Sequence, residues 1–152
     1  MREHLNVLNS RETKAILHLL ESQWGYARKL PFVVLQSSSD RLYLITPDFG
    51  RVDPQTINID AAGLYFGEMR HGELRVSIEG SQIIGPEATK NIAELDPLAM
   101  RSWLKGQDIP WEGDAEGFVL VKCGRDFLGC GKHKEGKILN FVPKARRILA
   151  TD

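Results

Sequence analysis

The run Gly117-Phe-Val-Leu-Val-Lys-Cys123 is the clearest buried-strand pattern in this chain. Gly124-Arg125 then predicts a turn, after which the chain returns through Asp126 to Gly129. We expect a glycine-rich turn at Gly129-Cys-Gly131 and a further strand over Lys137 to Val142. Short strands that follow one another in this way favour a small, partly closed β-barrel for this end of the chain.

The first half of the chain opens with a helix pattern. Asn9 and Glu12 have the three-residue spacing of a capping box, and Gly25 provides a stop. Apolar residues recur on one face between these signals, at Ile16, Leu17, Leu20 and Trp24. The sequence therefore predicts an amphipathic helix that ends at Gly25.

Two strand pairs are predicted after this helix. The strand-like runs are Phe32 to Leu35, Arg41 to Thr46, Leu64 to Met69 and Glu73 to Ile78. Polar turns separate the members of each pair, at Ser37 to Asp40 and at Arg70 to Gly72. Between the pairs, Pro47 to Asp60 is expected to be a loop with a short strand at Thr56 to Ile59.

A break in the pattern suggests where two halves meet. Gly80, Gly85 and Pro86 interrupt the apolar periodicity, so we place the boundary near residue 88, between domains 1–88 and 89–152. Beyond it we expect a strand over Asn91 to Leu95. A helix should then begin at Asp96-Pro97 and end at Lys105-Gly106. The predicted fold class is α+β, in which an N-terminal α/β half with a small, mostly antiparallel sheet precedes the C-terminal barrel.

The gross composition favours a globular protein inside the cell. The apolar share is 42% and the charged share 26%, and no apolar run approaches the roughly 20 residues of a membrane span. The amino terminus lacks the apolar stretch of a signal peptide. Two cysteines are too few for a disulfide framework. We therefore expect a protein with reduced thiols in the cytoplasm, or in the nucleolus of a eukaryotic cell.

Positive charge is concentrated near the carboxyl end. Residues 122–147 hold eight basic and two acidic residues, whereas residues 1–121 hold 12 basic and 17 acidic residues. A local positive field of this kind is typical of proteins that contact a phosphate backbone. The alternative is that these lysines and arginines simply form a solvated face.

Each type of side chain in this basic segment has its own chemistry toward RNA. Lysines act on phosphate as point charges, while Arg146 and Arg147 carry forked donors that bind phosphate or stack on a base. Asn140 is able to read a base edge or to cap a turn. His133 and Phe141 are candidates for stacking on an unpaired base.

Several short motifs in this segment resemble one known family. Leu128-Gly-Cys-Gly-Lys132, Lys137-Ile-Leu-Asn140 and Pro143-Lys-Ala-Arg146 are similar to the closing signature of the PUA-like RNA-binding domain that ends many ribosomal RNA cytosine-5 methyltransferases of the Sun/Fmu family. Trp103-Leu-Lys-Gly106 is similar to the helix of that domain, and Gly63-Leu-Tyr-Phe-Gly-Glu68 to the segment that precedes it. As a whole, the chain resembles small ribosome-biogenesis proteins built from a pre-PUA half and a PUA half.

The resemblance implies an RNA-binding role and a set of RNA-facing positions. These positions are Lys132, Lys137, Asn140, Lys144 and Arg146. On charge alone we add Arg125, Lys134 and Arg147. The implied function is a non-catalytic accessory factor in ribosome biogenesis or in rRNA or tRNA modification. Its implied partners are rRNA or tRNA, and an RNA methyltransferase or another ribosome-assembly protein.

The residues do not indicate an enzyme, a cofactor or a metal site. Cys123 follows a lysine and Cys130 a glycine, whereas an RNA cytosine-5 methyltransferase needs a cysteine in a Pro-Cys or Thr-Cys context. The chain also has no glycine-rich turn within a βαβ unit. Cys123, Cys130 and His133 do not have the spacing of a structural zinc site.

The sequence is compatible with two alternative functions. Asp48, Asp53 and Asp60 are able to line a divalent-metal site, which would suggest a metal-dependent RNA-processing enzyme. Their turn-rich setting instead favours aspartates that hydrogen-bond the backbone. The second alternative is an adaptor whose basic segment docks an acidic protein partner.

Overall fold

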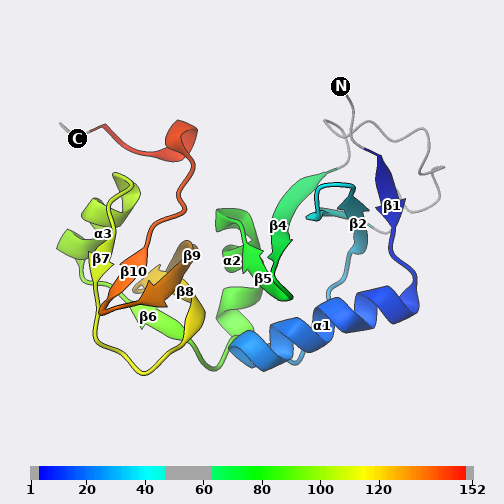
Figure 1. The fold of residues 1–152 in the computed structure, drawn as a ribbon, viewed down its shortest axis with the longest axis horizontal. Coiled ribbons are helices and arrows are strands. Elements are labelled where there is room, and N and C mark those ends of the chain that lie inside the picture. Colours follow the sequence, from blue (N-terminus) through cyan, green and yellow to red (C-terminus); the bar gives the residue numbers. More distant parts are fainter. Residues whose placement is uncertain (1–3, 47–62, 150–152) are drawn as a thin grey trace.

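The computed structural model of this chain describes residues 4–46 and 63–149. The predicted strand at Thr56 to Ile59 and the aspartates Asp48, Asp53 and Asp60 lie outside the described residues. Figure 1 shows two β-sheets next to each other along the long axis of the molecule, with the short helix α2 between them. The fold is therefore α+β, as the sequence predicts.

The first five strands form an antiparallel sheet, here called the N-terminal sheet, in the order β1-β2-β3-β4-β5. Its strands are β1 (Leu5–Val7), β2 (Val33–Ser37), β3 (Arg41–Ile45), β4 (Leu64–Arg70) and β5 (Glu73–Val76). Each strand pairs with the next one along the chain. Both predicted strand pairs are confirmed, and β1 is an additional strand that the sequence did not indicate.

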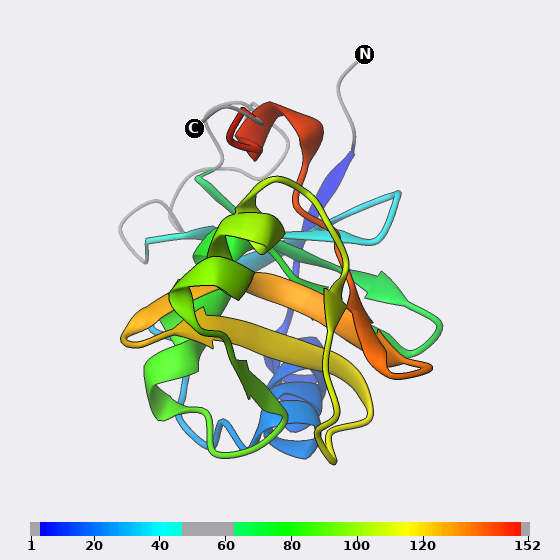
Figure 2. The ribbon, with the colours of Figure 1, turned by 90° about the vertical axis from the view of Figure 1, so that its left-hand side faces the viewer.

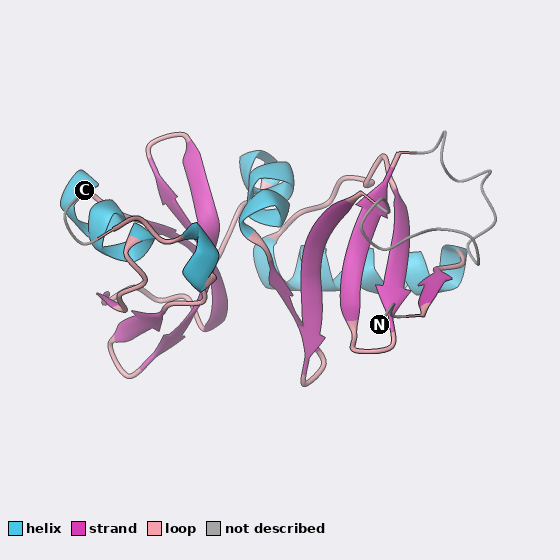
Figure 3. Ribbon diagram, turned by 90° about the horizontal axis from the view of Figure 1, so that it is seen from above, coloured by secondary structure: helices cyan, strands magenta, loops and turns pink. Residues whose placement is uncertain are grey.

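Helix α1 (Ser10–Trp24) lies across one face of the N-terminal sheet (Figure 3). Its predicted capping box is present, because Asn9 Oδ1 accepts the Glu12 N–H at 2.8 Å and Glu12 Oε1 accepts the Asn9 N–H at 3.0 Å. Gly25 ends the helix in the left-handed region with a φ of 69°. Both helix ends therefore lie where local hydrogen bonding predicts them.

The other five strands form the C-terminal sheet, in the order β6-β8-β9-β10-β7 (Figure 2). They are β6 (Ile92–Glu94), β7 (Ile109–Pro110), β8 (Gly117–Cys123), β9 (Asp126–Lys134) and β10 (Lys137–Leu139). β6 pairs with β8 in parallel and the remaining pairs are antiparallel. Within the described residues, β6 and β7 are the outer edges of an open sheet, so the expected barrel is not closed.

The predicted glycine-rich turn at Gly129–Gly131 is wrong, because these residues lie inside the long strand β9. Leu120 pairs with Cys130 and Lys122 with Phe127, so Leu128 and Gly129 together oppose a single residue of β8. This is a β-bulge, and Gly129 has a positive φ of 111°, a backbone conformation that glycine adopts without strain. The glycine therefore serves the bulge rather than a turn.

The turn that follows β9 lies further along the chain, at Glu135 and Gly136, and joins β9 to β10. Both residues have positive φ angles, of 52° and 79°. Two successive residues with positive φ are typical of the two-residue turns that match the twist of paired strands. The β9–β10 hairpin consequently ends in a tight tip flanked by Lys134 and Lys137.

Helix α2 (Ile78–Ile84) stands where the sequence predicted a break. It begins at Ser77, whose hydroxyl accepts the Gly80 N–H at 2.9 Å, and it continues into the 3-10 turn η4 (Gly85–Glu87). A helix this short depends on tertiary packing, and a Cβ at Gly80 would collide with the Phe66 carbonyl. The glycine thus permits close packing on the N-terminal sheet rather than ending a segment.

The second predicted helix is confirmed as α3 (Pro97–Leu104). Asp96 caps it by accepting the Ala99 N–H at 2.8 Å. After β10, which ends at Leu139 rather than at the predicted Val142, an extended segment leads to the 3-10 turn η5 (Lys144–Arg146). No helix among the described residues is long and apolar enough to cross a membrane.

The main hydrophobic core is built from both sheets. Leu20 and Trp24 of α1 and Phe66 of β4 belong to the same buried cluster as Phe118 and Leu120 of β8. The Trp24 indole N–H donates to the Phe118 carbonyl at 3.2 Å. The boundary at residue 88 stays a prediction, and the chain on either side of it contributes to this one core.

Candidate nucleic-acid interface

The tip of the β9–β10 hairpin concentrates positive charge. Lys134 and Lys137 are directly opposite each other in the register, and both are exposed. Like charges at opposed positions destabilise a strand pair. Lys137 Nζ lies 4.0 Å from Asp108 Oδ2, which offsets part of this repulsion. An anion at the tip would neutralise both lysines.

Lys132 lies further from the tip, beside a line of aromatic rings. Its Nζ is 5.5 Å from the ring centroid of Phe118. The Phe118 and Phe141 centroids are 6.2 Å apart, and the Arg75 guanidinium carbon is 4.5 Å from the Phe141 centroid. These four residues form a row, here called the cation–aromatic row, that runs from β9 to β5. Cations over aromatic faces are a common arrangement in single-strand nucleic-acid sites.

Asn140 has a structural role in the loop that follows β10. Its Nδ2 donates to the carbonyls of Trp103 at 2.8 Å and Gln107 at 2.9 Å. Its Oδ1 accepts the Val142 N–H at 2.7 Å. The carboxamide therefore bonds to three backbone groups of this loop region. Direct contact of Asn140 with RNA stays a prediction.

The cations of η5 and the next residue form a second group. Both carboxylate oxygens of Glu79 lie 3.0 Å from Arg146 Nη1, and the hydrogen bond to Glu79 raises the pKa of Arg146 above its ordinary value. Arg147 Nε donates to the Val142 carbonyl at 2.9 Å, and its side chain covers Gly106. Lys144 is exposed on η5. In this group, Arg146 and Arg147 are fixed by the fold.

Arg125 lies apart from the other predicted residues. It occupies the β8–β9 turn, at the opposite end of β9 from Lys134. A strand of this length places the two ends roughly 26 Å from each other. The predicted set is therefore divided among the hairpin tip, η5 and this turn, and Arg125 does not share a surface with the hairpin tip.

His133 packs within the C-terminal sheet. Its ring lies edge-on to Trp111 with 4.9 Å between centroids, and its Nδ1 donates to the Ala115 carbonyl. Stacking of His133 on a base therefore stays a prediction, in competition with these contacts. In the described part of the chain, no group of three or more His, Cys, Asp or Glu residues is arranged to hold a metal ion.

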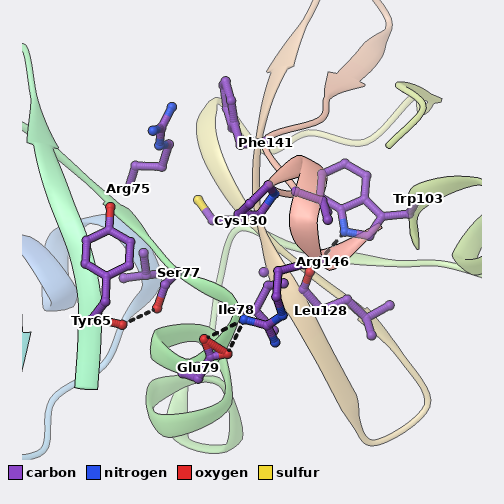
Figure 4. A pocket seen from close by; sticks show the side chains of 14 residues that line it. Tyr65, Arg75, Ser77, Ile78, Glu79, Trp103, Leu128, Cys130, Phe141 and Arg146 are labelled. Carbon is purple, nitrogen blue, oxygen red and sulfur yellow. Dashed lines mark hydrogen bonds and ion pairs between the residues drawn. The ribbon is translucent and has the colours of Figure 1, made fainter. Parts of the chain in front are cut away.

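A cavity of about 120 Å³, here called the inter-sheet cavity, lies between the two sheets (Figure 4). Tyr65 and Arg75 line it from the N-terminal sheet, and Cys130 from β9. Phe141 and Arg146 line it from the segment after β10. The cavity therefore joins one end of the cation–aromatic row to the η5 cations.

The two arginines of the cavity are each held by a carboxylate. Arg75 pairs with Glu68, which also pairs with Arg70, and Arg146 pairs with Glu79. Sequence reasoning missed Arg75, because it lies in the acidic part of the chain and only the fold brings it to Phe141. A strand that is far from the basic segment in the sequence gives no signal for such a contact.

Two backbone groups exposed by the β9 bulge are satisfied by flanking helices. The Gly129 N–H donates to Ser81 Oγ of α2 at 2.9 Å, and the Trp103 indole N–H of α3 donates to the Leu128 carbonyl at 3.0 Å. Both helices are thus fixed to β9 beside the cavity. This arrangement fixes the cavity wall, because buried backbone groups that lose a partner are costly.

Cys130 contributes an uncharged wall to the cavity. Burial raises the pKa of the Cys130 thiol to about 12, against smaller opposing effects of the Val76 backbone N–H and the Arg75 charge. The thiol is therefore protonated at physiological pH and behaves as a small hydrophobe.

Comparison with known proteins finds a family that is similar to the C-terminal part of the chain. Residues 90–148 match the family model described as the methyltransferase RsmF PUA domain. This segment contains the C-terminal sheet, α3 and η5. It also contains every residue that the sequence analysis predicted to face RNA.

Curated relatives align with more of the chain than this segment. The ribosomal RNA small subunit methyltransferase F of Aeromonas salmonicida is 25% identical over 138 residues, and that of Shewanella baltica strain OS155 is 26% identical over 144 residues. Each alignment covers 90% of this chain and 28% of the relative, so the chain spans little more than a quarter of their length. Residues 90–148 carry a PUA-like domain that resembles the C-terminal domain of the Sun/Fmu-family ribosomal RNA methyltransferases.

Proposed function

We propose that this chain is a non-catalytic RNA-binding protein that serves ribosomal RNA modification or ribosome biogenesis. The match of residues 90–148 to an rRNA methyltransferase PUA domain is the observation that carries this proposal. The exposed lysines at the hairpin tip and the η5 cations supply the positive charge that RNA binding requires.

The surface we assign to RNA runs from the hairpin tip along the cation–aromatic row to η5. Lys134 and Lys137 at the tip face no compensating acidic residue on the opposing strand position. Phosphate contacts at the tip would hold the RNA, and the rings of the row would support unpaired bases. Arg125 is outside this surface and is assigned no contact.

The protein partner we propose is a ribosomal RNA methyltransferase catalytic domain. The curated relatives are named as small-subunit methyltransferases, and this chain aligns with 28% of their length. A PUA-like module that holds structured RNA would raise the effective concentration of the RNA near such a domain. This chain would position the substrate and leave the chemistry to its partner.

A salt titration of binding tests the RNA surface. Binding to folded ribosomal RNA fragments that engages about four to six phosphates should give a slope of log affinity against log salt of about −3 to −5. Replacing Lys132, Lys137 and Arg146 together by alanine should flatten this slope. The matched control is the triple replacement of Arg11, Lys14 and Lys29, which are exposed and change the charge equally.

Three outcomes would count against this function or against the surface that we assign to it. Equal affinity for heparin and for folded RNA would favour the adaptor that docks an acidic partner. Cleavage of labelled RNA that requires magnesium or manganese, and that is lost in Asp48→Asn or Asp53→Asn, would favour the enzyme. RNA binding that tolerates the Lys132, Lys137 and Arg146 replacement as well as the control would place the interface elsewhere.

A further inference from the structure

The inter-sheet cavity has the dimensions of a site for one aromatic ring. Its volume is about 120 Å³. For comparison, an apolar cavity of about 150 Å³ in another protein holds one benzene ring. A single six-membered ring is therefore the largest planar group that fits without movement of the walls.

The walls offer faces on which such a ring can stack. Tyr65 is 37% exposed, Phe141 is half-buried, and both line the cavity. The buried side includes Val76, Trp103 and the protonated Cys130, which present no charge. Aromatic faces beside an uncharged floor favour a planar, largely neutral group over an ion.

Two guanidinium groups at the cavity are hydrogen-bond donors held in fixed positions by carboxylates, and one of these carboxylates, Glu79, also lines the cavity. Arg75 stacks on Phe141 and pairs with Glu68, and Arg146 pairs with Glu79 (Figure 4). A guanidinium has five N–H donors, so an ion pair with one carboxylate leaves further donors for a ligand. Carbonyl oxygens on a ring edge are acceptors that such donors recognise.

Phosphate-binding groups stand on both sides of the cavity. Lys132 lies at the far end of the cation–aromatic row from Arg75, and Lys144 lies on η5 next to the cavity residue Arg146. A polyanion that crosses this surface would pass directly over the cavity. A ring carried on a phosphate backbone is thus the ligand that matches both the uncharged wall of the cavity and the lysines beside it.

We propose that the inter-sheet cavity receives one unpaired pyrimidine base of the bound RNA. This inference rests on the proposed RNA-binding function and extends it to a specific site. The base stacks against Phe141 and Tyr65, and its carbonyl oxygens accept from Arg75 or Arg146. A purine, with two fused rings, exceeds the volume of the cavity and should bind less well.

Three stem-loop RNAs that share the same stem and differ only in the loop test this site. The loops are seven uridines, seven adenosines and seven abasic ribose units, which keep the phosphate count constant. We expect the uridine loop to bind about tenfold more tightly than the abasic loop, because stacking of one base contributes on this scale. The adenosine loop should fall between the two.

Variants of the ring-stacking residues make the test specific to the cavity. Phe141→Leu and Tyr65→Leu should each reduce the preference for the uridine loop over the abasic loop. Phe32→Leu is the matched control, because Phe32 is half-buried and does not line the cavity. Lys132→Ala with Lys137→Ala should weaken all three RNAs by the same factor. Thermal unfolding verifies that each variant is folded. If Phe141→Leu does not fold, Tyr65→Leu alone tests the site.

The outcomes separate this site from the general function. Equal affinity for uridine and abasic loops, with salt-dependent binding of both, would overturn the base site and leave the RNA-binding function standing. Absence of binding to any of the three RNAs and to folded ribosomal RNA would overturn both. A uridine preference that survives Phe141→Leu and Tyr65→Leu in folded protein would place base recognition outside the cavity.

Discussion

The side-chain amide of Gln23 hydrogen-bonds both backbone groups of Leu74. Its Nε2 donates to the Leu74 carbonyl at 2.8 Å, and its Oε1 accepts the Leu74 N–H at 2.7 Å. β5 is the edge of the N-terminal sheet, so these groups have no neighbouring strand on that side among the described residues. Helix α1 thus replaces a strand at one position of the edge, and β5 is held in place beside the inter-sheet cavity.

Replacement of Gln23 by alanine should destabilise the fold. Both backbone groups of Leu74 would lose their partner in a partly buried setting, which costs about 1–3 kcal/mol of the free energy of unfolding. Urea denaturation measures this change. Gln82→Ala is the control, because Gln82 is exposed and makes one long hydrogen bond of 3.4 Å. Equal stability of the two variants would show that water satisfies the β5 edge.

Replacement of Asp108 by asparagine should strengthen RNA binding. Asp108 Oδ2 lies 4.0 Å from Lys137 Nζ, while Oδ1 accepts the Asn140 N–H at 2.8 Å, a bond that asparagine is able to keep. Removing one negative charge beside the hairpin tip should tighten RNA binding about two- to fivefold at low salt, the scale of an exposed ion pair. The gain should shrink as salt rises, because exposed charges are screened. Glu87→Gln, which breaks the pair with Arg28, should leave RNA affinity unchanged. A similar gain in affinity for Glu87→Gln would show that only the net charge of the protein matters.

Replacement of Asn140 by alanine should act on stability first. The carbonyls of Trp103 and Gln107 and the Val142 N–H would each lose a partner, at a total cost of about 1–3 kcal/mol in the free energy of unfolding. Asn140→Asp keeps the acceptor and loses the donors, so it should be destabilised as well. Asn6→Ala, at an exposed position of β1, is the control. A fully stable Asn140→Ala protein that no longer binds RNA would instead support direct base contact by Asn140.

Cys130 should resist thiol reagents in the folded protein. Burial raises its pKa from 9.0 to about 12, and the thiolate is the reactive form, so its reaction at pH 8 should be at least about 100-fold slower than in urea. The measurement uses Cys123→Ser, in which Cys130 is the remaining cysteine of the sequence. Fast labelling of this variant without denaturant would contradict the buried position.

The same shift in pKa has a consequence for stability. Between about pH 9 and about pH 12 the folded protein retains the Cys130 proton, whereas the unfolded chain loses it. The contribution of this thiol to stability is therefore complete below about pH 9 and is lost as pH rises toward 12. The free energy of unfolding of Cys130→Ala should depend less steeply on pH over the accessible part of this range.

Local signals in the sequence predicted most of the regular elements. Helix α1 was delimited correctly, because the Asn9 and Glu12 side chains and Gly25 satisfy its ends without help from distant residues. The same holds for α3, which is capped by Asp96. In both cases the information lies within a few residues of the element.

Elements that depend on distant contacts were missed or misplaced. Gly80 suggested a break, but α2 forms because it packs against β4 and β9, and at Gly80 it approaches the Phe66 carbonyl of β4 to a distance that only glycine permits. Gly129 and Gly131 suggested a turn, whereas one serves a bulge and the other lies under Trp103 and Ile138. A glycine that is needed for space cannot be told from one that is needed for a turn without knowledge of its neighbours.

The candidate site was predicted in part for the same reason. Charge clustering identified the cations of the hairpin and of η5, which are close in sequence. It did not identify Tyr65 and Arg75, which meet Phe141 only after the two sheets have packed together. Arg125 joined the predicted set through its position in the sequence and is separated from the hairpin tip by the whole length of β9.

The core cluster that both sheets share restricts how the C-terminal sheet can be reused. Phe118, Leu120 and Phe127 are covered by groups that include Leu20 and Trp24, which precede residue 90. A graft of residues 90–148 alone onto another protein would carry an uncovered apolar underside. Any host, natural or engineered, must therefore provide a substitute for α1 that covers this apolar surface before the transplanted segment can remain folded and soluble.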